Sequence, residues 1–188
     1  MKNKIKILKI SQKCYSQRGF DDRGCYGCKC DDSCCKYGAD FDKTSYDLVI
    51  QYRHLIEPLI HQQIEKCFEN NFSGDPEFLG QNSIRSLLGE NGFCSFHKKN
   101  AKGCILYELA LGKKIDKRII PSICRLFPLS WFHGELLVYH EQPNAVIPHD
   151  CNCIETENST FKNILETQKN EILDIFDLDP ELLLQRPF

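Results

Sequence analysis

The chain has 188 residues, of which 41% are hydrophobic and 27% are charged, and this composition suits one compact domain. The formal charge of −2 gives no general attraction to nucleic acid or to an anionic membrane surface. No segment approaches the ~20 apolar residues that a membrane-spanning helix needs. We therefore expect neither a nucleic acid nor a membrane as a partner.

The first ten residues alternate lysine with isoleucine and leucine, which predicts a half-exposed strand over residues 4–10. A signal peptide would need a continuous apolar stretch there, so we expect the protein in the cytoplasm. Disulfides are rare in that compartment, and the twelve cysteines of the chain are better explained as metal ligands. The alternative, a secreted disulfide protein whose signal peptide has been removed, stays open.

Residues 24–35 hold five cysteines, with glycine and aspartate between them. The stretch has neither helical nor strand periodicity, and its turn residues allow several sulfurs to point into one volume. Soft sulfur ligands select zinc, Cu(I) or iron–sulfur clusters over hard cations. The stretch therefore predicts a metal site. Its two acids, Asp31 and Asp32, could be carboxylate ligands, but we interpret them as solvated turn residues.

Residues 48–68 carry apolar side chains at three- and four-residue steps, which predicts an amphipathic helix. Thr44, as the cap, and Asp47 fit the beginning of that helix, and Pro58 is expected to kink it or to mark the start of a second helix. Cys67 falls on the apolar stripe, so we interpret it as a buried core thiol. Cys14, isolated near the N-terminus, is interpreted as a spare thiol.

A short helix is predicted to begin at Asp75 and to end near Gly89 or Gly92. Cys94 and Cys104 lie in two apolar runs that flank a polar loop, a pattern consistent with a hairpin-like bend that brings the two cysteines together. The second run is predicted to continue as a helix to Gly112.

Prolines bracket the apolar residues 119–128, which predicts a rigid extended segment that holds Cys124 at a fixed depth. Residues 131–139 predict two strands around a glycine turn. Residues 161–176 predict an amphipathic helix, and Asp179 followed by Pro180 predicts a last short one.

The cysteine spacing resembles that of a known family. The matching motifs are Cys30-x3-Cys34-Cys35, Cys94-x9-Cys104-Ile-Leu-Tyr, Pro121-x2-Cys124-Arg-Leu-Phe-Pro and a late Cys151. Together they look like the YkgJ-type cysteine-cluster family, which is described as a zinc- or iron-chelating domain. The resemblance covers about residues 25–153 and leaves both ends of the chain uncovered.

The resemblance implies eight metal ligands, carried over position by position: Cys25, Cys30, Cys34, Cys35, Cys94, Cys104, Cys124 and Cys151. The chain departs from the family by having three residues, where two are more usual, before the vicinal pair. Cys28 is an alternative to Cys25, and Cys153 is an alternative to Cys151. His97 and His149 lie close to candidate ligands. Either could complete the site as a ligand, but we interpret them as hydrogen-bond partners of the site or as surface residues.

The spacing favours one or two iron–sulfur clusters over zinc, because widely spread cysteines accompany one dense group. Only Cys25 and Cys28 form the Cys-x2-Cys pair that a zinc ribbon repeats. The same pair could instead be a thiol–disulfide centre, although no βαβ pattern surrounds it. Arg125, which follows Cys124, is expected to offset part of the negative charge of the thiolates.

From the sequence we therefore expect an α+β, mainly helical protein, a single domain over residues 1–188 whose loops converge on a cysteine-ligated metal site. Its expected function is metal binding, with a structural or electron-carrying iron–sulfur cluster or zinc. One alternative is an enzyme similar to the flagellin lysine methylases, although the chain has no Gly-x-Gly-x-x-Gly loop. A second alternative is metal delivery or storage through surface thiols such as Cys14, Cys28 and Cys153.

Overall fold

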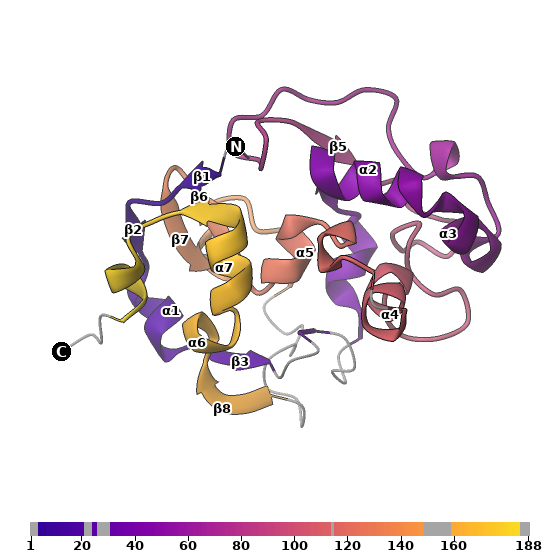
Figure 1. Cartoon of the computed structure of the whole chain (residues 1–188). Helices are drawn as coiled ribbons and strands as arrows, with labels where there is room; N and C mark the ends of the chain where they lie inside the picture. Colours follow the sequence, from indigo (N-terminus) through magenta and orange to yellow (C-terminus); the bar gives the residue numbers. More distant parts are fainter. Residues whose placement is uncertain (1–3, 21–23, 26–30, 114, 149–158, 185–188) are drawn as a thin grey trace. The chain divides into compact units, whose positions relative to one another are not determined.

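The structure, a computed structural model, describes residues 4–20, 24–25, 31–113, 115–148 and 159–184 (Figure 1). Short helices and short strands alternate along these residues, so the α+β class expected from the sequence is confirmed. Contacts divide the chain into a terminal unit, Met1–Cys30 with Arg125–Phe188, and a central unit, Asp31–Cys124. Whether the two units form the single domain that was expected over residues 1–188 depends on how they join, so that expectation remains a prediction.

The central unit is built from short helices and one strand pair. Strands β4 (Asp40–Asp42) and β5 (Ser83–Arg85) run antiparallel, with Phe41 opposite Ile84. Its helices are α2 (Lys43–Gln51), α3 (Arg53–Ile60), α4 (Ile105–Gly112) and the 3-10 helices η1 (Ser33–Tyr37), η2 (Ile64–Lys66) and η3 (Lys117–Ile119). Helix α5 (Ser122–Leu126) begins in the central unit and ends in the terminal unit.

Three phenylalanines form an aromatic core in the central unit. The rings of Phe41, Phe68 and Phe96 lie with centroids 5.0 to 5.4 Å apart, and their residues are 1%, 4% and 1% exposed. Aromatic pairs at this separation contribute about 0.5–1.5 kcal/mol beyond the burial of their surface. Because Phe96 lies between Cys94 and His97 in the sequence, this core anchors the loop that carries them.

The buried carboxylate of Asp42 joins segments that are distant in the sequence. Its Oδ1 accepts a hydrogen bond from the N–H of Ser45 at 3.1 Å, in the first turn of α2. Its Oδ2 accepts from the Ser45 hydroxyl at 2.8 Å and from the N–H of Ser122 at 3.2 Å, where α5 begins. Asp42 is only 1% exposed, so these donors supply the hydrogen bonds that a buried carboxylate requires.

The terminal unit contains a three-stranded sheet and two separate strand pairs. In the sheet, β7 (Glu135–Val138) lies between the parallel β2 (Lys9–Ile10) and the antiparallel β6 (Leu129–Phe132). The pairs are the parallel β1 (Ile5–Lys6) with β9 (Phe176–Asp177) and the antiparallel β3 (Arg18–Phe20) with β8 (Ser159–Asn163).

The helices of the terminal unit are α1 (Gln12–Ser16), α6 (Ile164–Thr167), α7 (Lys169–Ile175) and the 3-10 helices η4 (Tyr139–Glu141) and η5 (Pro180–Leu183). Helix α6 packs against α7 and against the β3–β8 pair (Figure 1). Its Ile164 is fully buried, as are Ile172 and Ile175 of α7. The apolar face expected for an amphipathic helix in this segment is therefore confirmed at these three residues.

Several local predictions are confirmed. The β6–β7 hairpin turns at His133 and Gly134, whose φ angles of 48° and 75° match a tight turn with two left-handed residues. Helix α4 ends at Gly112, and Asp179 caps η5 by accepting a hydrogen bond from the N–H of Glu181. In each case neighbouring residues are sufficient to specify the element.

Two helix predictions in the central unit are wrong in part. Helix α2 begins at Lys43, and its cap is Asp42, two residues before the expected cap Thr44. The interruption between α2 and α3 falls at Tyr52. Pro58 lies inside α3, close to its end at Ile60. Its missing N–H removes one backbone hydrogen bond there, and the break in the helical stretch comes six residues earlier in the chain.

The helix expected to begin at Asp75 is absent from the described residues. The Asp75 carboxylate accepts from the N–H of Glu77 at 2.9 Å and closes a local turn. Residues Ser83–Arg85 then pair with β4 as strand β5. Pairing with a distant strand therefore outweighs the local helical signal.

The extended segment expected over residues 119–128 is also wrong, because Cys124 lies on helix α5. Pro121 directly precedes that helix, where a missing N–H costs nothing, and Pro128 follows its end. The segment expected as a strand over residues 4–10 is divided into β1 and β2, which have different partners. The helix expected over residues 161–176 begins only at Ile164, after β8.

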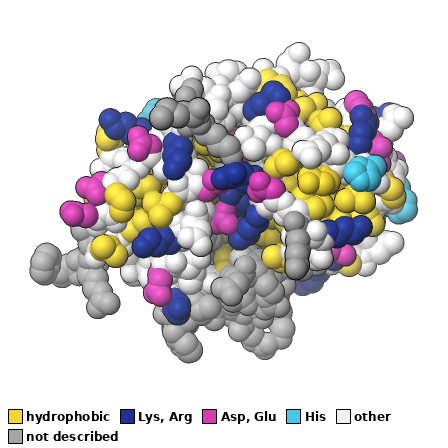
Figure 2. Space-filling view, viewed as in Figure 1, with side chains coloured by type: hydrophobic (Ala, Val, Ile, Leu, Met, Phe, Trp, Pro, Cys, Tyr) yellow, Lys and Arg dark blue, Asp and Glu magenta, His cyan; other side chains and the backbone are white. Residues whose placement is uncertain are grey.

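No helix in the described part of the chain is long and apolar enough to cross a membrane. Hydrophobic side chains are nevertheless visible on the surface around α3 (Figure 2). Leu59 of α3 is 45% exposed. Scattered apolar residues of this kind are normal on protein surfaces.

We predict that Phe96→Ala lowers the free energy of unfolding by about 3–5 kcal/mol, because it opens a cavity in the aromatic core. Phe132→Ala is the matched control, since Phe132 is 37% exposed, and it should cost less than about 1 kcal/mol. Urea unfolding of both variants measures the difference. Equal losses would show that the aromatic core does not anchor the central unit.

Candidate metal centre

Cys34 and Cys35 lie on η1 directly after Asp32. The backbone of Asp32 is left-handed, with φ of 52°, a conformation that aspartate tolerates better than most residues. The N–H of Cys35 donates to the carbonyl of Asp32 at 2.9 Å, and the thiol of Cys35 is hydrogen-bonded to that of Cys34. The turn therefore places two adjacent sulfurs side by side.

Cys94 and Cys104 are brought together by the expected hairpin-like bend. His97 and Cys104 face each other in an antiparallel bridge, closed by the N–H of Lys98 to the carbonyl of Gly103 at 3.0 Å. The N–H of Cys94 also donates to the carbonyl of Cys35 at 2.7 Å. This bond connects the hairpin to the vicinal pair.

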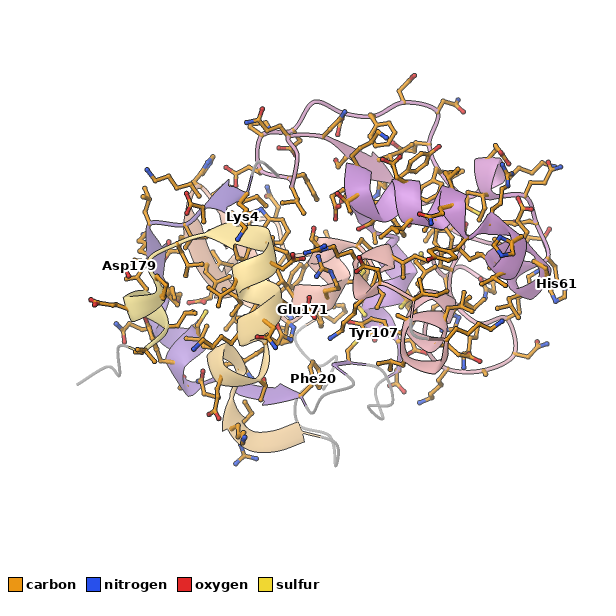
Figure 3. The ribbon with its side chains drawn as sticks, in the orientation of Figure 1. Lys4, Phe20, His61, Tyr107, Glu171 and Asp179 are labelled. Carbon is orange, nitrogen blue, oxygen red and sulfur yellow. The ribbon has the colours of Figure 1, made fainter. Side chains whose placement is uncertain are left out.

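Cys124 joins the group from α5. The hydroxyl of Tyr107, on α4, donates to the carbonyl of Cys124 at 3.0 Å, and Figure 3 labels Tyr107 on that helix. Cys104 directly precedes α4. The helix therefore links the segment of Cys104 to the segment of Cys124.

The thiols of the central unit influence one another electrostatically. The pKa of Cys35 is raised, first by its hydrogen bond to Cys34 and then by burial. The charge of Cys34 raises it further, and so do the charges of Cys104 and Cys124. Thiols from three separate segments therefore act on one sulfur.

Burial is the main cause of the shifts at the hairpin. It raises the pKa of Cys104 to about 12, with additional contributions from the charges of Cys94 and Cys34. It also raises the pKa of Cys94, against a hydrogen bond from Ser86 and the charge of Arg85, which lower it. Both residues are partly exposed, but their surroundings are dense enough for desolvation to dominate.

Asp32 and His97 are polar residues beside these thiols whose role the sequence did not indicate. Asp32 is 8% exposed, so the expectation that it is a solvated turn residue is wrong. Its Oδ2 lies 2.9 Å from Nε2 of His97 and accepts from the N–H of Gly103, also at 2.9 Å. Phe93 stacks on the imidazole of His97 with ring centroids 4.3 Å apart. In the sequence, the only signal for this arrangement was the spacing Cys94-x2-His97. That spacing is equally compatible with a histidine on the surface.

Five of the eight expected ligands thus belong to the central unit: Cys34, Cys35, Cys94, Cys104 and Cys124. Cys25 lies in a turn of the terminal unit. Cys30 and Cys151 lie outside the described residues, as do Cys28, Cys153 and His149. No disulfide joins the described cysteines, and within the described residues no three histidine, cysteine or acidic side chains stand ready to hold a metal.

Two other cysteines are buried core thiols. Cys67 is fully buried, as expected, and accepts a hydrogen bond from Nε2 of Gln62 at 3.0 Å. Cys14 is also fully buried, and its thiol donates to the carbonyl of Leu136 at 3.7 Å. The suggestion that Cys14 delivers metal from the surface is therefore wrong, because helix α1 packs its thiol against β7.

Arg125 is occupied within the terminal unit. Its Nη1 binds the carboxylates of Glu171 and Asp174 on α7, the latter at 3.1 Å, and Figure 3 labels Glu171 on that helix. The side chain of Arg125 is only 2% exposed. Two carboxylates therefore already balance the guanidinium charge that was expected to offset thiolates.

Comparison with known proteins finds no matching family model, no matching curated protein and no matching solved structure.

We predict that Cys14 makes the stability of the protein depend on alkaline pH. Burial, followed by the charges of Glu141 and Glu135, raises the pKa of Cys14 from 9.0 to about 12. Below pH 9 the thiol is protonated in both states, so its stabilising contribution is fully present. Between pH 9 and 12 only the unfolded chain ionises, so stability falls by at most about 1.4 kcal/mol per pH unit.

Urea unfolding of the wild type and of Cys14→Ala at several pH values measures this contribution. The variant should lose stability less steeply above pH 9, by the equivalent of one proton, although its stability at neutral pH is lower. Parallel curves for the two proteins would contradict the assignment of Cys14 as a thiol that titrates with a raised pKa in the folded state.

Proposed function

We propose that this chain is a metal-binding protein whose centre is formed by the thiols of the central unit. The donors are Cys34, Cys35, Cys94, Cys104 and Cys124, with further ligands from Cys25, Cys30 and Cys151 as the YkgJ-type resemblance implies. An iron–sulfur cluster is favoured over zinc, and its role is structural or electron-carrying. The cytoplasm is the proposed location, because a reducing compartment keeps such thiols available.

One observation carries the proposal: hydrogen bonds connect the thiol-bearing segments, from the N–H of Cys94 to the carbonyl of Cys35 at 2.7 Å and from Tyr107 of α4 to the carbonyl of Cys124 at 3.0 Å. In agreement with this geometry, the charges of Cys34, Cys104 and Cys124 all raise the pKa of Cys35. Repulsion between neighbouring thiolates opposes the ionisation of such thiols, and a soft cation removes the repulsion when it binds the sulfurs and displaces their protons. A structural disulfide would need only two cysteines in close contact. The gathering of several thiols therefore supports metal binding better than disulfide formation.

The donor set fits a soft metal, since sulfur is the ligand that zinc and iron–sulfur clusters prefer. Because no three donors stand ready within the described residues, loading also requires the thiols to rotate toward a common centre. Before a metal binds, the backbone of the donor segments is held in place by contacts of Asp32, Phe96 and Asp42. When bound, the metal would either crosslink these segments or act as a redox centre that accepts and donates one electron.

We expect protein purified without oxygen to contain stoichiometric metal, with acid-labile sulfide and broad visible absorbance if the centre is an iron–sulfur cluster. Cys35→Ser and Cys104→Ser should lose most of this metal, because each removes a donor from the thiol group. Cys14→Ser is the matched control and should keep it. Metal analysis of the four proteins tests the proposal, and wild-type protein that binds neither iron nor zinc would refute it.

We also predict that removal of the metal lowers the thermal stability of the chain sharply. Structural zinc contributes on the order of 10–16 kcal/mol to folding, comparable with the entire net stability of a domain, about 5–15 kcal/mol. Circular dichroism melting before and after chelation or oxidative loss of the metal measures the effect. An unchanged melting temperature would exclude a structural role for the centre.

A further inference from the structure

One nitrogen of His97 has no partner among the described residues, although it is buried. The side chain of His97 is 7% exposed, and within the described part of the chain no hydrogen bond reaches its Nδ1. Burial of a polar atom without a partner costs free energy comparable with a lost hydrogen bond. Such an atom needs an explanation, and a bound ion or water is one that would satisfy it.

The other nitrogen of His97 determines what Nδ1 can do. Nε2 lies 2.9 Å from Oδ2 of Asp32, and an ionised carboxylate only accepts hydrogen bonds, so Nε2 carries the hydrogen. In the neutral imidazole, Nδ1 is then left with its lone pair. A carboxylate that holds one imidazole nitrogen and orients the other is the usual arrangement of metal-binding histidines.

The hairpin places this imidazole beside a candidate ligand. His97 and Cys104 are directly opposite in an antiparallel bridge. The bonds from Lys98 to Gly103 and from Ile105 to Phe96 flank the pair and do not pass through it. In a pair of this kind the two side chains lie on the same face at the closest spacing that a ladder offers.

The environment also holds the ring in one orientation. Phe93 stacks on its face, with planes inclined by 18°, and Asp32 is itself held by the N–H of Gly103. Rotation about the side-chain bonds of His97 would break the Asp32 contact and the stack together. The ring is therefore oriented in advance, as a ligand to a metal should be.

We propose that Nδ1 of His97 is a metal ligand beside Cys104, with Asp32 as the carboxylate that orients it. The inference rests on the proposed metal-binding function and adds a nitrogen donor to its sulfur donors. The centre would then be a mixed nitrogen–sulfur site. For an iron–sulfur cluster, histidine in place of cysteine raises the reduction potential, whereas for zinc it gives one of the common cysteine–histidine donor sets.

X-ray absorption at the edge of the metal carried by the anaerobically purified, full-length chain tests this assignment. We expect the wild type to show a nitrogen shell inside the sulfur shell, at about 2.0–2.1 Å against 2.3 Å for zinc. His97→Gln should lose one nitrogen scatterer, because its amide nitrogen takes the place of Nε2 toward Asp32 but offers nothing at the position of Nδ1. His97→Cys should retain the metal with sulfur in place of that nitrogen.

Affinity for Zn²⁺, measured by competition with a chelator, gives a second readout. His97→Gln should weaken binding at least about tenfold, and Asp32→Asn, which removes the orienting carboxylate, about 10–100-fold. His54→Ala is the matched control, because His54 is an exposed histidine of the same unit, and it should bind Zn²⁺ as the wild type does. Circular dichroism of the metal-loaded variants confirms that each one folds.

The outcomes separate this proposal from the proposed function. If His97→Gln and His97→Cys keep the wild-type nitrogen shell and affinity, His97 is not a ligand, and the thiol centre stands without it. If the wild type binds neither iron nor zinc, the proposed function fails, and this inference fails with it. If His97→Gln does not fold, the sulfur and nitrogen shells of His97→Cys decide the assignment.

Discussion

The thiol-bearing segments of the central unit depend on the buried carboxylate of Asp32. The carbonyl of this residue accepts from the N–H of Cys35, and its side chain accepts from the N–H of Gly103 and contacts His97. One residue therefore connects the turn of the vicinal cysteines with both arms of the hairpin that carries Cys94 and Cys104. Asp32 is 8% exposed, and its buried carboxylate is tolerated because these partners satisfy it.

Asp42 performs the corresponding task for the last thiol of the unit. By accepting from the N–H groups of Ser45 and Ser122, it joins the beginning of α2 to the beginning of α5, where Cys124 lies. The aromatic core of Phe41, Phe68 and Phe96 includes one residue of β4, the strand that carries Asp42, and one residue of the hairpin between Cys94 and Cys104. Two buried acids and one apolar core thus set the positions from which the sulfurs act on one another.

Reasoning from the sequence succeeded where neighbouring residues decide the structure. The turn at Gly134, the bend between Cys94 and Cys104, the end of α4 at Gly112 and the burial of Cys67 all follow from short-range patterns. It failed at Asp75 and at Cys124, where a strand partner and a distant cap override the local signal. It also missed the burial of Cys14, because the strand that covers this thiol, β7, lies more than a hundred residues away in the sequence.

The sequence by itself determined the chemistry that the chain can offer: soft sulfur donors in number, with a spacing that resembles a chelating family, on an α+β chain. Only the tertiary structure decided which cysteines lie in the central unit and which are buried alone, and it alone placed Asp32 and His97 beside Cys35 and the hairpin. The physical reason is that a turn or a cap depends on a few adjacent residues. A buried carboxylate depends on donors from remote segments, and no local pattern encodes those contacts.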